Sequence, residues 1–351
     1  MKFVPFHDIP KPEKCLAVDC THRKALPLSH WKEAGSPPKL HDDTSTAITL
    51  NAIKSGLHLE FDYVTNNHFD IDGFLGVWSL LNPELGLQHE EIFRQAALIG
   101  DFRELPDLSN SDNLTALKLV CLINTLEKKL FYAPFEAQDQ IEKESKACVE
   151  KYQFFNSKFN DYLFNHDNFE HLWIDEFQKV IEGNKNITSI IDVDHIRLKI
   201  VTAAKPSHYY SLFKGSENSD MVLTIYPENR YELEYKYTTW VDTNRISFPR
   251  VDMTSLIDTL NSLEKNKGCW TGDKITDTGP ILRLSNESLS KAECFDHPFN
   301  RPIHKSSIDN DTFINTVISF YEDAYKHITP KIRYTWKEIK EWNINKDKIQ
   351  D

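Results

Sequence analysis

Residues 57–81 read LHLEFDYVTNNHFDIDGFLGVWSLL, and this stretch carries the strongest structural signal in the chain. Its first part, Leu57–Val64, alternates apolar and polar residues, a pattern that predicts a β-strand. The apolar run Phe74–Leu81 predicts a helix that begins directly after Gly73. The polar segment Asn66–Gly73 is therefore expected at a strand-to-helix turn. In open α/β sheets, ligands bind at this end of the strands.

The turn concentrates side chains that bind metal ions. Asp70 and Asp72 are two residues apart, so their carboxylates can point the same way and repel each other unless a cation or a shared proton lies between them. Hard divalent cations favour oxygen ligands, and Mn²⁺ also accepts a histidine such as His68. We therefore predict a Mn²⁺ or Mg²⁺ site. The alternative is purely structural, with Asp72 and Gly73 serving only to cap the helix.

Composition limits the class of protein. A chain of 351 residues that is 40% hydrophobic has room for about two domains. Its net charge of −12 argues against bulk binding of nucleic acid. The longest apolar runs are too short to span a membrane, and the first residues lack the apolar core of a signal peptide. Six scattered cysteines without a CxxC pair fit reduced thiols, so we expect a cytoplasmic protein without membrane association. The oligomeric state stays open.

The chain divides by pattern into two parts. Residues 1–185 predict an α/β domain with a parallel sheet, a metal site and a helical insertion. Residues 186–351 predict a strand-rich α+β domain with a helical tail. Within the first part, residues 1–55 show little periodicity and are expected to form a long loop. The expected helices and strands are 113–132 and 136–182 (helical), and 189–193, 196–201, 221–226 and 231–237 (strands).

Three further residues are candidates for the same site. Asp101 follows a helix predicted from about Glu90 to Leu98, so it is expected either at the C-terminal turn of that helix or, as the family resemblance given below implies, at the end of a later strand. His30 and Asp43 lie in the N-terminal segment within the polar stretches Ser-His-Trp and Asp-Asp-Thr-Ser. If that segment folds back onto the turn, His30 and Asp43 complete the ligand set. Asp43 or Thr44 is also placed to cap the helix that follows.

The hexapeptide His68–Gly73 resembles the first motif of the DHH phosphoesterase superfamily, and Asp101 takes the place of that family's second motif. The resemblance implies an α/β fold and a metal-dependent hydrolase acting on a small-molecule or short phosphoester substrate. It implies metal ligands at His68, Asp70, Asp72, Asp101 and Asp43, with Asp70, Asp72 and His30 as catalytic residues. The Asp-His-His motif is missing. The whole chain also looks similar to an uncharacterised bacterial family that shares the Asn-Asn-His-Phe-Asp-x-Asp-Gly stretch.

Two other functional interpretations remain at this stage. Residues Phe69–Leu75 also resemble the motif of haloacid-dehalogenase-like phosphatases, which implies that Asp70 is a nucleophile and Asp72 a general acid/base. A third possibility is a non-catalytic binding protein on a degenerate phosphoesterase scaffold, because the histidine pair is missing. An EF-hand is excluded, since Ser79 stands where the calcium loop requires a bidentate Glu.

Overall fold

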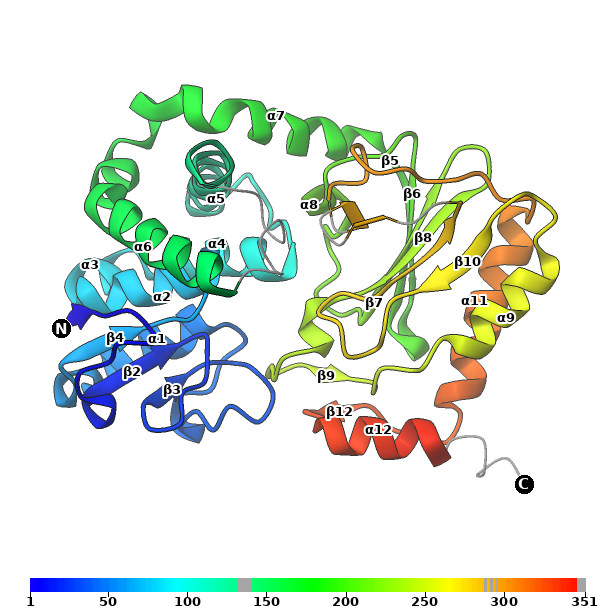
Figure 1. Cartoon of the computed structure of the whole chain (residues 1–351). Coiled ribbons are helices and arrows are strands. Elements are labelled where there is room, and N and C mark those ends of the chain that lie inside the picture. Colours follow the sequence, from blue (N-terminus) through cyan, green and yellow to red (C-terminus); the bar gives the residue numbers. More distant parts are fainter. Residues whose placement is uncertain (132–140, 287–288, 291–292, 295, 346–351) are drawn as a thin grey trace. The chain divides into compact units, whose positions relative to one another are not determined.

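The computed structural model of the chain describes residues 1–131, 141–286, 289–290, 293–294 and 296–345 (Figure 1). The chain forms two compact units, Met1–Gln178 (unit 1) and Lys179–Asp351 (unit 2). Unit 1 contains a parallel four-stranded sheet, and unit 2 contains a mixed six-stranded sheet. The prediction of an α/β fold with two parts is confirmed at this level.

The sheet of unit 1 has the strand order β1-β4-β2-β3, and every neighbouring pair is parallel. Its strands are β1 (Lys2–Phe3), β2 (Cys15–Val18), β3 (Leu26–Leu28) and β4 (Tyr63–Thr65). All four residues of β2 are buried, so this strand forms the centre of the sheet's core. Because the strands run in the same direction, their carboxyl ends lie along one edge of the sheet.

Two predictions for this region were wrong. Residues 1–55 were expected to be a loop, yet they supply three strands that are too short to produce a visible alternation. Leu57–Val64 was expected to be one strand, but its first four residues, Leu57–Glu60, form a 3₁₀ helix (η3). Only Tyr63 and Val64, at the end of the stretch, belong to β4. Gly56 reverses the chain with a φ of 76°, and Leu59 points into solvent with 79% of its surface exposed. The alternating pattern therefore has no core to face.

Several of the helices that begin in unit 1 start at a side-chain cap. Thr44 accepts a hydrogen bond from Ala47 N and starts α1, while Asp70 accepts one from Gly73 N and starts α2. A break at Asn82–Pro83, which the sequence predicts because proline does not continue a helix, separates α2 from α3. The helices are α1 (Ser45–Lys54), α2 (Ile71–Leu81), α3 (Pro83–Gln88), α4 (Glu90–Phe102), α5 (Ser111–Leu130), α6 (Ile141–Phe164) and α7 (Glu170–Asn186), and a 3₁₀ turn, η4 (His166–Phe169), precedes α7.

Of the two positions expected for Asp101, the C-terminal turn of a helix is correct and the end of a strand is wrong. Asp101 lies in the last turn of α4, which ends at Arg103 with a left-handed φ of 57°. The apolar run before it is helical because Gly100 lies directly against Ile71 of α2, where a Cβ would come within 2.5 Å of the isoleucine Cβ. Close packing of α4 on α2 thus overrides the strand-like composition of the run.

The sheet of unit 2 has the order β10-β11-β8-β7-β6-β5, in which only β6 and β7 are parallel neighbours. Its strands are β5 (Ile187–Val193), β6 (Leu198–Ala203), β7 (Met221–Tyr226), β8 (Arg230–Tyr235), β10 (Cys269–Gly272) and β11 (Ile281–Ser285). A short pair, β9 (Ile246–Ser247) with β12 (Lys331–Ile332), lies outside this sheet. The four strands predicted between residues 189 and 237 are all present, with bounds shifted by a few residues.

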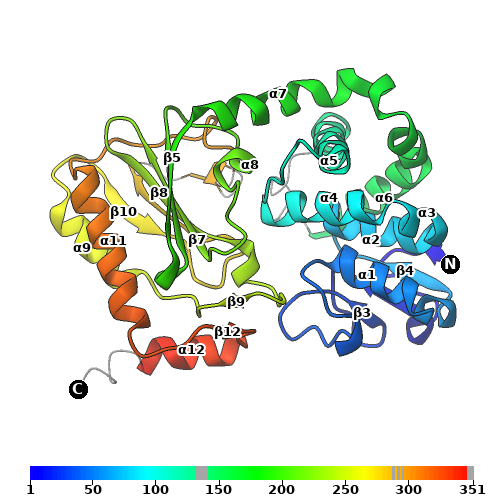
Figure 2. The same cartoon turned by 180° about the vertical axis from the view of Figure 1, so that it is seen from behind.

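One face of this sheet is apolar and covered by helices. Figures 1 and 2 both show α9 (Thr254–Leu263) and α11 (Asn310–Tyr325) side by side against it, and α12 (Trp336–Asn345) follows. The four-residue helix α8 (Tyr209–Leu212) packs near the other face through Leu212. Strand β8 was expected to be half-buried, but Tyr231–Tyr235 is buried on both faces because Glu232 is neutralised by Arg301. None of the described helices has the length and apolar character needed to cross a membrane.

Candidate metal centre

The carboxyl edge of the unit 1 sheet gathers five ionisable side chains from distant parts of the sequence. Strand β2 ends at Asp19, β3 leads through Ser29 to His30, and β4 leads into the turn that holds His68. Asp70 and Asp72 belong to the cap and first turn of α2. The parallel topology is what brings these segments together, since each strand delivers its last residues to the same edge.

Asp19 lies at the centre of the group. Its backbone has a φ of 50°, in the left-handed region that Asp tolerates better than most residues. Its Oδ1 atom lies 3.3 Å from Nε2 of His30, and its Oδ2 atom lies 3.2 Å from Nε2 of His68. Ser45 Oγ also donates a hydrogen bond of 2.7 Å to Oδ1. One carboxylate is therefore shared between two imidazoles.

Both imidazoles are held in the same tautomer. Nδ1 of His30 lies 2.7 Å from the carbonyl oxygen of Asp43, and Nδ1 of His68 lies 2.8 Å from Oδ1 of Asn67. These oxygens only accept hydrogen bonds, so each Nδ1 carries a proton and each Nε2 faces the carboxylates. A neutral imidazole would then direct a lone pair at negatively charged oxygens. A cation or a second proton has to lie between them, and metal-binding histidines are oriented in this way.

The two aspartates of the turn are bound to helix N-termini. Asp72 is fully buried, and its two carboxylate oxygens each accept a 2.7 Å hydrogen bond, one from Ser45 N and one from Thr46 N at the start of α1. Asp70 Oδ1 accepts a 2.7 Å hydrogen bond from Gly73 N, while its Oδ2 lies 3.1 Å from His68 Nε2. The prediction that Asp72 caps the helix was therefore wrong: Asp70 caps α2, and Asp72 binds the start of α1 instead. Each carboxylate oxygen keeps lone pairs for a second partner.

The electrostatics of the group show how tightly it is coupled. Burial would lower the pKa of His30, but its hydrogen bond to Asp19 and the charges of Asp101, Asp19 and Asp72 raise it to about 10. Burial, together with the charge of Asp19, raises the pKa of Asp72 to about 6. Burial also raises the pKa of Asp101 well above its usual range. Carboxylates that resist ionisation in this way gain from a nearby divalent cation.

The predicted residues differ in how far the structure brings them together. His30, Asp72 and Asp19 offer ligand atoms within 4.8 Å of one another, and so do His68, Asp70 and Asp19. Asp101 is adjacent, with Oδ2 3.3 Å from His30 Nε2. Among the described side chains, the carboxylate of Asp43 is in neither group, because this residue holds His30 through its backbone carbonyl. Its expected role as a ligand is replaced by an orienting role.

Sequence reasoning missed Asp19, the residue that joins the two groups. A signal was present: four consecutive apolar residues, Cys15–Val18, run directly into this aspartate. The strand is too short to show periodicity. It also lies far upstream of the turn Asn66–Gly73, so the sequence does not show that Asp19 and the turn are close in space. Asp42, a neighbour of the predicted Asp43, binds Arg94 at 2.7 Å instead of joining the cluster.

The two groups differ in exposure. The side chains of His30 and Asp72 are inaccessible to solvent, whereas those of His68 and Asp70 are 31% and 36% exposed. The donors are carboxylate oxygens and imidazole nitrogens without a thiolate, a set that suits Mn²⁺, Mg²⁺, Fe²⁺ or Zn²⁺. The outer group, Asp19 with His68 and Asp70, is the part that a substrate or a water molecule can reach.

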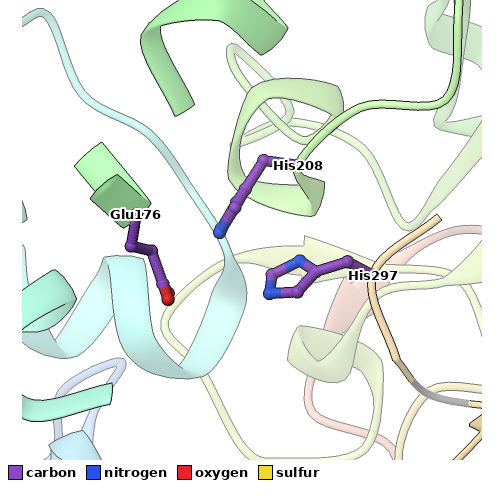
Figure 3. Close-up of side chains that lie close together, drawn as sticks. All are labelled: Glu176, His208 and His297. Carbon is purple, nitrogen blue, oxygen red and sulfur yellow. The ribbon is translucent and has the colours of Figure 1, made fainter. Parts of the chain in front are cut away.

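A second histidine pair lies in unit 2. The ring centroids of His208 and His297 are 4.1 Å apart, and Figure 3 shows the two side chains close together. The ring of Tyr209 stacks on His297 at the same centroid distance. Nδ1 of His208 accepts a hydrogen bond of 3.2 Å from Tyr210 N. In the neutral form its Nε2 then carries the proton and cannot bind a metal ion. We interpret this pair as aromatic packing at the start of α8.

The comparison with known protein families identifies the chain's family. Residues 1–332 match the model of a family of unknown function, DUF6687, so the chain belongs to this family. The predicted membership of an uncharacterised family is confirmed. No curated protein matches the chain significantly. No solved structure does so either.

Proposed function

We propose that this protein is a divalent-metal-dependent hydrolase, and that its substrate is a small phosphoester. The observation that carries the proposal is the position of Asp19, whose two oxygens face His30 at 3.3 Å and His68 at 3.2 Å. A carboxylate shared in this way suits two neighbouring cations, the arrangement that many phosphatases and nucleases use. When bound, such ions lower the pKa of a water molecule and stabilise the leaving oxygen.

The chain's own residues have distinct tasks in this proposal. Asp43 and Asn67 hold the two imidazoles so that Nε2 faces the site. Asp72 belongs to the inner group, which consists of Asp19, His30 and Asp72, and it also binds the start of α1. This contact keeps the inner group buried and rigid. Asp70, on the exposed side, is the residue closest to where substrate enters. The motif His68–Gly73 and its place after a parallel strand support the resemblance to DHH phosphoesterases, with Asp19 and His30 in place of the missing histidine pair.

The dehalogenase-like alternative is less favoured. A nucleophilic Asp70 needs one carboxylate oxygen directed at the substrate, but Oδ1 caps α2 and Oδ2 lies against His68. The first motif of that family also follows an apolar strand directly, whereas Asn66, Asn67 and His68 intervene here. A non-catalytic metal-binding protein is the remaining alternative, and the activity assay below distinguishes it.

The test combines metal content with turnover. The purified chain is stripped with a chelator, titrated with Mn²⁺ in a calorimeter, and assayed with bis(p-nitrophenyl) phosphate. We expect two Mn²⁺ ions per chain and Mn²⁺-dependent hydrolysis. Asp19→Asn should abolish both, whereas the matched change Asp62→Asn, at an exposed residue of the same unit, should alter neither. A chain that binds no divalent metal ion contradicts the proposal, and metal binding without turnover of any phosphoester supports the non-catalytic alternative.

A further inference from the structure

Three polar atoms gather at one point next to the outer group of the candidate metal centre. A Cβ placed on Gly73 would lie 2.2 Å from Nδ2 of Asn66 and 3.3 Å from Oη of Tyr152. The same point is 3.0 Å from Oδ1 of Asp70, a proposed metal ligand. A residue larger than glycine would displace the Asn66 carboxamide, so Gly73 makes room for polar groups beside this ligand.

Two of these atoms are buried without a hydrogen-bond partner. Asn66 is 1% exposed and Tyr152 is fully buried. Within the described residues, neither Asn66 Nδ2 nor Tyr152 Oη makes a hydrogen bond. Buried polar atoms of folded proteins nearly always have a partner, and the exceptions often mark a functional site or an ordered water molecule. Here the exceptions lie beside the proposed metal centre.

Both side chains are held firmly in place. The ring of Tyr152 stacks on Phe3 with ring centroids 4.6 Å apart, and it packs edge-on against Phe69 at 5.3 Å. Asn66 is fixed by its Oδ1 atom, which accepts a hydrogen bond of 3.2 Å from His68 N. Burial raises the pKa of the Tyr152 hydroxyl well above its usual range, so the hydroxyl keeps its proton. Two preorganised donors therefore lie next to the outer group.

The chemistry of the three groups allows one order of hydrogen bonds. The Nδ2 atom of Asn66 only donates, a carboxylate oxygen only accepts, and a phenol hydroxyl does both. Asp70 Oδ1 accepts a hydrogen bond of 2.7 Å from Gly73 N and keeps a lone pair for a second donor. The order that satisfies every atom runs from Asn66 to Tyr152, and from Tyr152 to Asp70.

We propose that Tyr152 is a positioning residue of the outer group, and that its hydroxyl donates a hydrogen bond to Asp70 Oδ1, directly or through one water molecule, when a metal ion is bound at Oδ2. The inference rests on the metal centre of the proposed function but not on its hydrolytic activity. A second donor on Oδ1 keeps Oδ2 turned towards His68 Nε2, which lies 3.1 Å away. Metal-binding carboxylates are commonly oriented by hydrogen bonds of this kind.

The test removes one hydroxyl at a time from the same helix. Tyr152→Phe keeps the ring, and Tyr162→Phe is the matched control, because both tyrosines are buried in α6 and Tyr162 packs against Phe169. Mn²⁺ is titrated into the full, chelator-stripped chain in a calorimeter. We expect Tyr152→Phe to bind one of its two Mn²⁺ ions about 10–100-fold more weakly than the wild type, and Tyr162→Phe to match the wild type.

Two further measurements separate positioning from packing. In urea denaturation without metal, Tyr152→Phe should be at least as stable as the wild type, because a buried hydroxyl without a partner only costs desolvation. The double variant Tyr152→Phe/Asp70→Ala should bind Mn²⁺ as Asp70→Ala does, since the hydroxyl then has no carboxylate to hold.

The outcomes distinguish this inference from the proposed function. If the wild type binds two Mn²⁺ ions and Tyr152→Phe binds both with the same affinity, the inference is overturned and the metal centre stands. A wild-type chain that binds no divalent metal ion overturns both. A loss of affinity that persists in the Asp70→Ala background also contradicts the inference, because the hydroxyl would then act through another group.

Discussion

The buried carboxylates of unit 2 and those of the candidate metal centre in unit 1 have different partners. In unit 2, Glu232 is held by the guanidinium of Arg301 through two hydrogen bonds of 2.9 Å, and Asp220 lies 3.0 Å from Arg197. In unit 1, the ion pairs of Asp19 and Asp72 among the described residues are with imidazoles. Arginine is always charged and completes its pair, whereas a histidine can exchange its proton for a metal ion. The first arrangement indicates structure and the second indicates a binding site.

The largest effect is expected where a complete pair is broken. Arg301→Met leaves Glu232 buried without its counter-charge and should lower the free energy of unfolding by about 3–5 kcal/mol, as measured by urea denaturation. The double variant Arg301→Met/Glu232→Leu should regain most of this loss, because neither charge then remains. Lys305→Met, which removes an exposed pair with Glu228, should cost less than about 1 kcal/mol. An equal loss in the single and double variants would contradict the comparison.

The next effect belongs to the metal centre. Mn²⁺ at about 100 times its Kd should raise the free energy of unfolding by about 2.7 kcal/mol over the chelated protein, since the ion binds only the folded chain. Thermal unfolding with and without EDTA measures this increment. The Lys305→Met variant should show the same increment, while Asp19→Asn should show none. If EDTA leaves the unfolding curve of the wild-type chain unchanged, the carboxylates of the candidate metal centre do not bind a metal ion, and the proposed difference from unit 2 is contradicted.

A smaller effect separates the two tasks of Asp70. In metal-free protein, Asp70→Ala should cost about 1 kcal/mol because it removes the cap of α2, whereas Asp70→Asn should cost little, since Asn is an equally good cap. In Mn²⁺ both variants should bind the outer ion more weakly than the wild type. Chemical denaturation and Mn²⁺ titration report the two tasks independently. Equal Mn²⁺ affinity in Asp70→Asn and the wild type would show that Asp70 caps α2 but does not bind the metal ion.

The smallest effect is a pH dependence in unit 2. Although partial burial acts to raise it, the pKa of Glu264 is lowered from 4.5 to about 2 by hydrogen bonds from Ser306 and Ser307. A carboxyl whose pKa is lower in the folded chain stabilises it above pH 4.5, and this contribution disappears as the pH falls towards 2. Glu264→Gln should therefore be less stable than the wild type at pH 6 and equally stable near pH 2. A difference that persists at pH 2 would point to packing instead of charge.

Local signals in the sequence predicted a good part of unit 1. The turn Asn66–Gly73, the helix after it and the break at Pro83 depend on neighbouring residues, so a single stretch of sequence contains the necessary information. The same holds for the cap at Thr44. Strand β2 escaped prediction because four residues are too few for a periodic pattern. The position of Asp101, at a helix end or a strand end, stayed open because it depends on the packing of α4 against α2.

The sequence alone determined the two-part α/β architecture and the polar turn. Only the tertiary structure decided which side chains lie close to the turn Asn66–Gly73. Asp19 and Asp72 are 53 positions apart in sequence, yet both lie within 3.8 Å of His30 Nε2. Burial of β2 between its parallel neighbours, and the anchoring of α1 on Asp72, bring them together. Such contacts arise from hydrophobic burial and strand pairing across the whole unit, which no single stretch of sequence encodes.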